Sequence, residues 1–321
     1  KTVFSSCALI KVLSLKKQFQ LKLWLLAVRP RTLLISVAPM LLSQFLAWQA
    51  LNHSQGETLQ ASVPGFSWLL ALLCLSCALL LQISVNLAND YFDHRSGVDD
   101  DHRLGPVRVT QQGLLKPEQV KLGFIVSLVL GVSAGLAVMA LSSALLFWLG
   151  LLCVFGVLTY TSGPFPLAYN ALGELVVFLV FGPVAVMGGY YAQCQELLVL
   201  LWLPACAMGL LAAAIMLTNN VRDDSSDRKA GKRTIVFFLG MGASRGLYLT
   251  MVGLAAISAL VFVVMSYGAA WFSLLIVPWT IWLCRKFLVR SGAELNDQLA
   301  QTAQFMLVVA VLLMLDVQFI G

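Results

Sequence analysis

Hydrophobic residues along this chain form long unbroken runs instead of alternating with polar ones. Most runs match the roughly 20 apolar residues that a helix needs to cross a bilayer. None shows the alternation, over segments of about ten residues, that is typical of a membrane β-strand. We therefore predict an all-α, polytopic membrane protein with nine transmembrane helices. The predicted spans are 32–50, 67–90, 121–141, 144–161, 172–193, 198–219, 245–267, 270–284 and 303–320.

Composition and charge support this assignment. Of the 321 residues, 60% are hydrophobic and 11% are charged, whereas about a quarter of a soluble domain is charged. The net charge of +6 does not indicate nucleic-acid binding, because nine spans place every Lys and Arg on one side of the membrane. The other side carries Glu57 and Glu196 and no basic residue. This positive-inside pattern predicts a cytoplasmic N-terminus and an outside C-terminus.

The chain has no linker long enough to separate soluble domains. We predict one membrane-embedded domain over 1–321, which begins with a cytoplasmic arm at 1–31 suited to the inner membrane surface. Two long cytoplasmic loops, expected at 94–120 and 221–244, each follow an acidic cluster. This weak repeat divides the chain into two halves, about 32–161 and 172–320, that deliver their clusters to a shared cavity.

The two acidic clusters are the strongest functional signal, because carboxylates at membrane helices are costly and mark a functional site by default. Helical spacing places the polar residues of the first cluster on one face, and Asp223 and Asp227 share a face if their helix extends that far. Mg²⁺ prefers such hard oxygen ligands and commonly combines one or two carboxylates with phosphate oxygens. The clusters therefore predict a Mg²⁺ site that holds a diphosphate. They read Asn86-Leu-Ala-Asn89-Asp90-Tyr-Phe-Asp93 and Asn219-Asn220-Val-Arg222-Asp223-Asp224-Ser-Ser-Asp227-Arg228.

Basic residues near the clusters are candidate partners for the diphosphate, because Arg can hold phosphate oxygens bidentately. The alternative for each one is topology alone, since Lys and Arg in cytoplasmic loops simply follow the positive-inside rule. The candidates are Arg95, Arg103, Arg108, Arg222, Arg228, Lys232 and Arg233.

The connection at 160–174 faces the cytoplasm in this topology yet has no basic residue. Its Gly and Pro residues predict an irregular backbone, which is tolerated at membrane depth only where it lines a cavity or is buried in protein. Tyr160, Tyr169 and Asn170 are candidates for orienting an aromatic acceptor, with a structural turn as an equal alternative. Asp316, near the outer end of the last span, is interpreted as an interfacial residue.

These residues together resemble the UbiA superfamily of intramembrane aromatic prenyltransferases, over most of the chain. Within it, the chain is most similar to the branch that acts on 1,4-dihydroxy-2-naphthoate in menaquinone synthesis, because Gly97 stands where the 4-hydroxybenzoate branch usually has another Asp. One departure is His102, where an acid often precedes the Arg. The matching motifs are Arg29-Pro-Arg-Thr-Leu33, Asn86-Leu-Ala-Asn-Asp-Tyr, Gly97-Val-Asp99, Arg103-Leu-Gly-Pro-Val-Arg108, Gln112-Gly113, Gly173-Glu174, Asn219-Asn-Val-Arg-Asp223, Asp227-Arg228 and Gly231-Lys232-Arg-Thr234.

The resemblance implies a helical bundle around a central cavity, open sideways to lipid, in the bacterial cytoplasmic (inner) membrane. It implies that an all-trans polyprenyl group passes from polyprenyl diphosphate to 1,4-dihydroxy-2-naphthoate, with loss of CO₂, giving demethylmenaquinone. The residues expected to hold Mg²⁺ and diphosphate are Asn89, Asp93, Asp223 and Asp227, with Asp90 also assigned to catalysis. Substrate binding is assigned to Asn86, Arg103, Arg108, Tyr160, Asn219, Arg222 and Lys232.

Other functions remain open at this point. Another ring, such as 4-hydroxybenzoate or homogentisate, is the nearest alternative acceptor. A secondary transporter also carries intramembrane acids, although here they cluster at one mouth instead of at mid-membrane. A phosphatidyltransferase of the CDP-alcohol type is disfavoured, because its Asp-Gly-x-x-Ala-Arg run is absent. The sequence predicts neither the prenyl chain length nor the oligomeric state.

Overall fold

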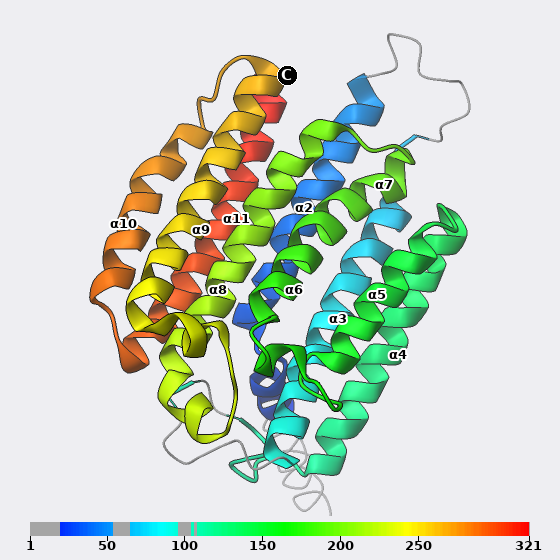
Figure 1. Cartoon of the computed structure of the whole chain (residues 1–321). Coiled ribbons are helices and arrows are strands. Elements are labelled where there is room, and N and C mark those ends of the chain that lie inside the picture. Colours follow the sequence, from blue (N-terminus) through cyan, green and yellow to red (C-terminus); the bar gives the residue numbers. More distant parts are fainter. Residues whose placement is uncertain (1–19, 54–64, 96–103, 106–107, 321) are drawn as a thin grey trace, which may run out of the picture.

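Long apolar runs become helices in this protein, because a helix satisfies its own backbone hydrogen bonds, which lipid cannot do. The computed structural model describes residues 20–53, 65–95, 104–105 and 108–320, and none of these residues lies in a strand. Figure 1 shows the helices as one bundle. They are α2 (Pro30–His53), α3 (Trp68–Arg95), α4 (Pro117–Leu141), α5 (Leu146–Thr159), α6 (Gly173–Leu179), α7 (Gly188–Cys194), α8 (Trp202–Lys229), α9 (Ile235–Tyr267), α10 (Ile276–Val289) and α11 (Leu295–Ile320).

Seven helical segments of the described chain are long and apolar enough to cross a membrane. One of them combines α6 and α7, which are joined by a π-helical turn at Val180–Met187. The helices α5 and α10 have 14 residues each, which at 1.5 Å per residue cover about 21 Å. The hydrocarbon core is about 30 Å thick. The all-α membrane bundle is therefore confirmed, whereas helix length alone does not confirm nine crossings.

Close packing of α8 against the α6–α7 segment relies on glycine. A Cβ atom added at Gly182 would lie 2.5 Å from the carbonyl oxygen of Ala205, and one added at Gly209 would lie 2.6 Å from that of Phe178. Small residues at such crossings let the backbones of membrane helices approach each other. This contact fixes one wall of the cavity described below.

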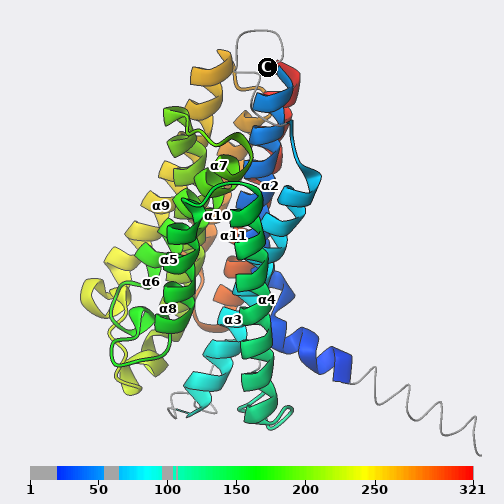
Figure 2. The ribbon, with the colours of Figure 1, turned by 90° about the vertical axis from the view of Figure 1, so that its right-hand side faces the viewer.

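The polar ends of α3 and α8 lie at the same end of the bundle, opposite the C-terminus (Figures 1 and 2). Both helices continue beyond their apolar runs, to Arg95 and Lys229. The prediction that 221–244 forms a long loop is therefore wrong: α8 includes 221–229, and α9 begins at Ile235 after a short turn. The helix can continue because its charged side chains pair along it, as Arg228 does with Asp224 four residues earlier, at 2.8 Å.

Asp316 is fully buried, so its interpretation as an interfacial residue is wrong. Its carboxylate accepts hydrogen bonds from the backbone N–H groups of Trp271, Phe272 and Ser273 at 3.0, 2.8 and 2.8 Å. These groups begin the helical turn that leads into α10. A carboxylate is stabilised at that position by the unpaired N–H groups of a helix start. Asp316 thus ties α11 to α10.

Candidate functional site

A cavity of about 390 Å³ lies among α2, α3, α5, the α6–α7 segment and α8. The first polar cluster contributes Asn86, Asn89 and Asp93 to its lining, all from α3. The second cluster contributes residues of α8, namely Asn219, Asn220, Asp223 and Asp227. Two segments about 130 positions apart in the sequence therefore face one cavity.

Asp93 is held by side chains from two other segments. It is 2% exposed, one carboxylate oxygen forms an ion pair with Arg108, and the other accepts a hydrogen bond from the Tyr169 hydroxyl. Lys232 lies over the Tyr169 ring, with its Nζ 4.5 Å from the ring centroid. Since Arg108, Tyr169 and Lys232 all line the cavity, positive charge gathers beside this carboxylate.

The carboxylates of α8 are oriented by cations in the same way. Arg222 donates from Nε to Oδ1 of Asp223 at 2.8 Å and from Nη2 to Oδ2 at 2.6 Å. Arg222 also donates to the side-chain oxygens of Asn219 and Asn296 at 2.6 and 2.8 Å. Lys232 pairs with Asp227, with 3.3 Å between Nζ and Oδ1. A bidentate Arg–carboxylate pair restricts both partners, so Asp223 has a fixed direction toward the cavity.

The oxygen atoms at the cavity mouth fit a hard divalent cation. Asn89 Oδ1 is buried and has no hydrogen-bond partner in the described structure, although leaving such an atom unsatisfied costs about 1–3 kcal/mol. No group of three or more His, Cys, Asp or Glu residues in the described ranges is arranged as a metal site. Mg²⁺ does not require one, because it usually takes one or two carboxylates and completes its shell with water and phosphate oxygens. The residues that fit it are Asn89, Asp93, Asp223 and Asp227.

Asp90 and Arg222, two predicted site residues, do not line the cavity. Asp90 is buried and accepts hydrogen bonds from the backbone N–H of Val109, at 3.2 Å, and from the Thr110 hydroxyl. It therefore anchors the segment that carries Arg108. Arg222 lies behind Asp223, with its side chain fully buried. Both residues position others instead of reaching into the cavity.

Other predicted basic residues lie away from the cavity or outside the described structure. Arg228 pairs with Asp224 and lies 5.0 Å from the centroid of the Phe237 ring. Arg95 and Arg233 are exposed and absent from the cavity lining. Arg103, predicted to bind substrate, lies outside the described residues.

The connection between α5 and α6 lines the cavity, as its Gly and Pro content predicts. Tyr160 and Tyr169 both contribute to the lining, and the Tyr160 hydroxyl donates to Met216 Sδ at 3.1 Å. Asn170 does not reach the cavity, because its amide donates to the carbonyl of Pro166 at 2.7 Å. The two ends of this irregular connection therefore lie against the cavity, whereas its middle, at Gly163, Pro164 and Phe165, is exposed.

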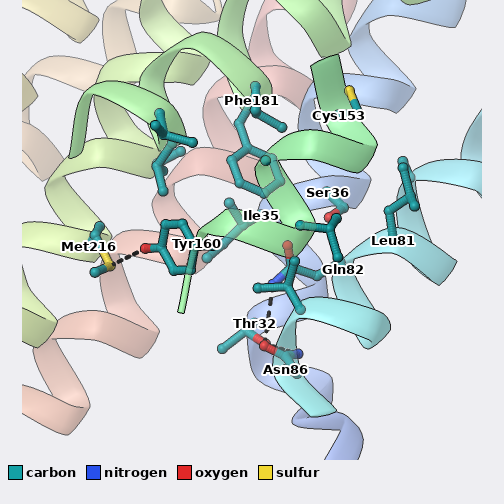
Figure 3. Close-up of a pocket in the computed structure, with 18 of the residues that line it drawn as sticks. Thr32, Ile35, Ser36, Leu81, Gln82, Asn86, Cys153, Tyr160, Phe181 and Met216 are labelled. Atoms are coloured by element: carbon teal, nitrogen blue, oxygen red, sulfur yellow. Dashed lines mark hydrogen bonds between the residues drawn. The ribbon is translucent and has the colours of Figure 1, made fainter. Parts of the chain in front are cut away.

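Figure 3 shows an inner wall of which only Asn86 was predicted as a site residue, and Thr32 was noted only as part of a motif. Thr32 and Ser36 of α2, four residues apart, lie beside Gln82 and Asn86 of α3, also four apart, and all line the cavity. Asn86 Nδ2 donates to the Thr32 hydroxyl at 3.0 Å and to the Val28 carbonyl at 2.9 Å. Polar side chains one turn apart in an apolar span were the available signal.

Comparisons with known proteins agree on one family. The model of the UbiA prenyltransferase family matches residues 54–309. A 1,4-dihydroxy-2-naphthoate octaprenyltransferase of Escherichia coli (strain K12) is 40% identical over 223 residues, covering 68% of each chain. Enzymes of the same name from Mycobacterium tuberculosis and Haemophilus influenzae are 37% and 33% identical, cover 89% and 91% of this chain, and are themselves covered to 93% and 94%.

Solved structures show the same fold at low sequence identity. A UbiA homologue from Aeropyrum pernix K1 matches with a TM-score of 0.64 at 17% identity, covering 88% of this chain and 97% of its own. A UbiA homologue from Archaeoglobus fulgidus, bound to DMAPP and Mg²⁺, matches with a TM-score of 0.59 at 16% identity, covering 90% and 98%.

Proposed function

This chain belongs to the UbiA prenyltransferase family, and from that premise we propose that it transfers a polyprenyl group from an all-trans polyprenyl diphosphate to 1,4-dihydroxy-2-naphthoate. The observation that carries the proposal is the meeting of Asn89 and Asp93 of α3 with Asp223 and Asp227 of α8 at one cavity. The choice of acceptor is supported by the names of relatives that are 33–40% identical over most of the chain.

The mouth of the cavity binds the diphosphate. Asn89, Asp93, Asp223 and Asp227 supply the oxygen ligands for Mg²⁺, and bound Mg²⁺ supplies positive charge that stabilises the departing diphosphate. Arg108 and Lys232 add positive charge from protein groups that line the same cavity. Because these charges are in place before the reaction, they stabilise the developing charge of the leaving group more than the ground state.

The deeper, apolar part of the cavity holds the reacting carbons away from water. There the allylic C–O bond breaks and a new C–C bond forms at the ring carbon that bears the carboxylate. That carboxylate then leaves as CO₂, and its electron pair restores the aromatic ring. The product is demethylmenaquinol, the reduced form of demethylmenaquinone, and no oxidant or extra proton is needed. Ile35, Phe181 and Met216 help to exclude water that would quench the allylic carbon.

The bundle crosses a bacterial cytoplasmic membrane nine times in this proposal, with the N-terminus inside and the C-terminus outside. The 3₁₀ turn at Ser273–Leu275 extends α10 to 17 residues, from Ser273 to Val289. Both acidic helix ends lie opposite the C-terminus (Figures 1 and 2). The positive-inside rule assigns that basic, acidic end to the cytoplasm.

The proposal is tested by an acceptor assay with the purified protein in lipid nanodiscs. A labelled polyprenyl diphosphate is incubated with Mg²⁺ and, in separate reactions, with 1,4-dihydroxy-2-naphthoate, 4-hydroxybenzoate or homogentisate. We expect prenylated product and CO₂ only with the naphthoate, and loss of product when EDTA removes the metal. Product formed only with one of the other rings, or with none of them, contradicts the proposed function.

A further inference from the structure

The inner wall between α2 and α3 carries a directed chain of hydrogen bonds (Figure 3). Gln82 Nε2 donates to Asn86 Oδ1 at 3.4 Å, and Asn86 Nδ2 donates to the Thr32 hydroxyl at 3.0 Å. The Thr32 hydroxyl in turn donates to the carbonyl of Arg29 at 2.9 Å. These polar side chains therefore have partners within the protein.

Ser36, one helical turn after Thr32, is the exception on this wall. It lines the cavity, it is 2% exposed, and its hydroxyl has no hydrogen-bond partner in the described structure. Helical Ser and Thr commonly donate to the carbonyl four residues earlier. Thr218, Ser244 and Thr302 do so here, each at 2.8 Å. Ser36 does not, so a buried donor without a partner in the described structure is left beside the cavity.

The neighbouring turn of α2 provides a second polar group. Pro39 lies inside α2 and has no N–H, so it cannot donate the usual helical hydrogen bond to the carbonyl of Ile35. Ile35 also lines the cavity. The Ile35 carbonyl therefore lacks its usual donor four residues later in α2, which favours a polar ligand beside Ser36.

The opposite wall of the cavity consists of aromatic rings and a polarisable thioether. Tyr160 and Met216 lie across the cavity from Ser36 and Gln82 in Figure 3, with Phe181 above them. The Tyr160 hydroxyl is already engaged with Met216, so this wall offers mainly ring and thioether surface. Such surfaces favour a flat aromatic ligand. A cavity that is polar on one side and apolar on the other fixes the orientation of a ring with oxygen substituents along one edge.

We propose that the Ser36 hydroxyl donates a hydrogen bond to the 1-hydroxyl or the 2-carboxylate of the aromatic acceptor, and so determines acceptor specificity. This inference rests on the proposed function and names the residue that recognises its acceptor. Ser36 lies one helical turn after Thr32, which pairs with Asn86, and it is on a different helix from the proposed diphosphate ligands. Its loss therefore affects binding of the acceptor and leaves binding of the prenyl donor unchanged.

Ser43 supplies a matched control on the same helix. It is fully buried, its hydroxyl also has no partner in the described structure, and it does not line the cavity. Ser36→Ala and Ser43→Ala therefore remove the same group from similar surroundings, and only one of them faces the ligand. Ser36→Cys, which replaces the hydroxyl by a larger thiol that is only a weak hydrogen-bond donor, is used if Ser36→Ala does not fold.

The experiment measures the Kd of 1-hydroxy-2-naphthoate by calorimetry, in detergent and without prenyl diphosphate, so that no turnover occurs. We expect Ser36→Ala to raise this Kd about 10-fold and Ser43→Ala to leave it within about 2-fold. The KM for the naphthoate acceptor should rise by a similar factor while the KM for polyprenyl diphosphate stays constant.

Three results overturn the inference. The first is a Kd for Ser36→Ala equal to that of the wild type, and the second is equal weakening by both variants, which shows a packing effect of α2. In either case, wild-type turnover of the naphthoate keeps the proposed function intact. The third is a wild-type chain that prenylates no naphthoate, which removes the proposed function and this inference together.

Discussion

At the scale of residues, the site consists of acids that are each matched by a cation. Burying a charge is costly unless it is paired and hydrogen-bonded, and Asp93, Asp223 and Asp227 meet this requirement through Arg108, Arg222 and Lys232. These pairs hold the carboxylates toward one cavity before any ligand arrives. Ligand binding at the cavity mouth therefore depends on carboxylates that cations hold in fixed directions, more than on a complete set of metal ligands supplied by the protein.

Helical spacing predicted most of the first cluster correctly and misplaced one member. Each residue turns 100° from the previous one, so Asp90 points 100° away from Asn89 although both are near Asn86 on the helical wheel. In the structure Asn86, Asn89 and Asp93 line the cavity. Asp90 is instead hydrogen-bonded to the segment that follows Arg108. Helical spacing shows which residues share a face of the helix. Which of them line the cavity depends on the segments that pack against that helix.

Asp93→Asn and Asp223→Asn should each lower kcat for prenyl transfer by at least about 100-fold, because each removes charge that stabilises the transition state. Asp224→Asn is the matched control: it lies on α8 beside Asp223, pairs with Arg228 and does not line the cavity. We expect it to keep near wild-type turnover of labelled prenyl diphosphate. Asp93→Asn with most of its activity would contradict the assignment.

Asn89→Leu should raise the Mg²⁺ concentration that gives half-maximal activity. The Asn89 amide oxygen is buried without a partner in the described structure, and the loss even of an outer-shell partner of a metal ligand commonly weakens metal affinity about 10- to 100-fold. Asn170→Ala, which removes an amide bonded to Pro166 away from the cavity, serves as the control. Identical Mg²⁺ titrations for Asn89→Leu and the wild type would remove Asn89 from the metal site.

At the scale of elements, apolar runs predicted where helices lie but not where they end. Hydropathy reports contact with lipid, so the predicted spans stopped at 90 and 219, whereas α3 and α8 continue to Arg95 and Lys229. On α8 the pair of Arg228 with Asp224 supports this extension. On α3 the acids Asp90 and Asp93 bond instead to the segment that carries Arg108. The two extensions carry Asp93, Asp223 and Asp227, so the site lies on helices and not on loops.

Gly240→Ala should destabilise the protein by about 1–3 kcal/mol, because its backbone, at φ 73° and ψ 169°, is a conformation essentially restricted to glycine. No atom lies within 4 Å of the added Cβ, so the effect comes from the backbone alone. Gly246→Ala is the control, also with open space but inside regular helix, where Ala is favoured over Gly by up to about 1 kcal/mol. Thermal unfolding in detergent measures both, and an unchanged midpoint for Gly240→Ala would contradict the strained kink.

At the scale of the whole molecule, the internal repeat predicted that two distant clusters meet, and the cavity shows that they do. The inner wall of Thr32, Ser36 and Gln82 could not be predicted in the same way. It depends on α2 packing beside α3, and hydrophobic patterning marks both helices without revealing which helices are neighbours. Acceptor recognition is therefore a property of the assembled bundle, whereas the diphosphate motifs are already visible in the linear sequence.

The orientation of the bundle in the membrane is also a property of the whole molecule. Alkaline phosphatase is active only outside the cytoplasm, so a fusion at the C-terminus should be active and one at the turn after Lys229 should be inactive. The reason is that basic residues gather with the acidic helix ends at one end of the bundle, which the positive-inside rule places in the cytoplasm. The reverse pattern, or equal activity at both positions, would contradict nine crossings with the N-terminus inside.

The central claim is that α3 and α8 hold one diphosphate between them. Mg²⁺-dependent binding of an unreactive prenyl thiolodiphosphate to the wild type, Asp93→Asn, Asp223→Asn and the double variant tests it directly. We predict that each single change raises the Kd at least about 10-fold and that the double change adds little more, because residues that act on one ligand are coupled. Wild-type affinity in either single variant would show that the helix ends do not share a ligand, and two losses that simply multiply would contradict the predicted coupling between the two carboxylates.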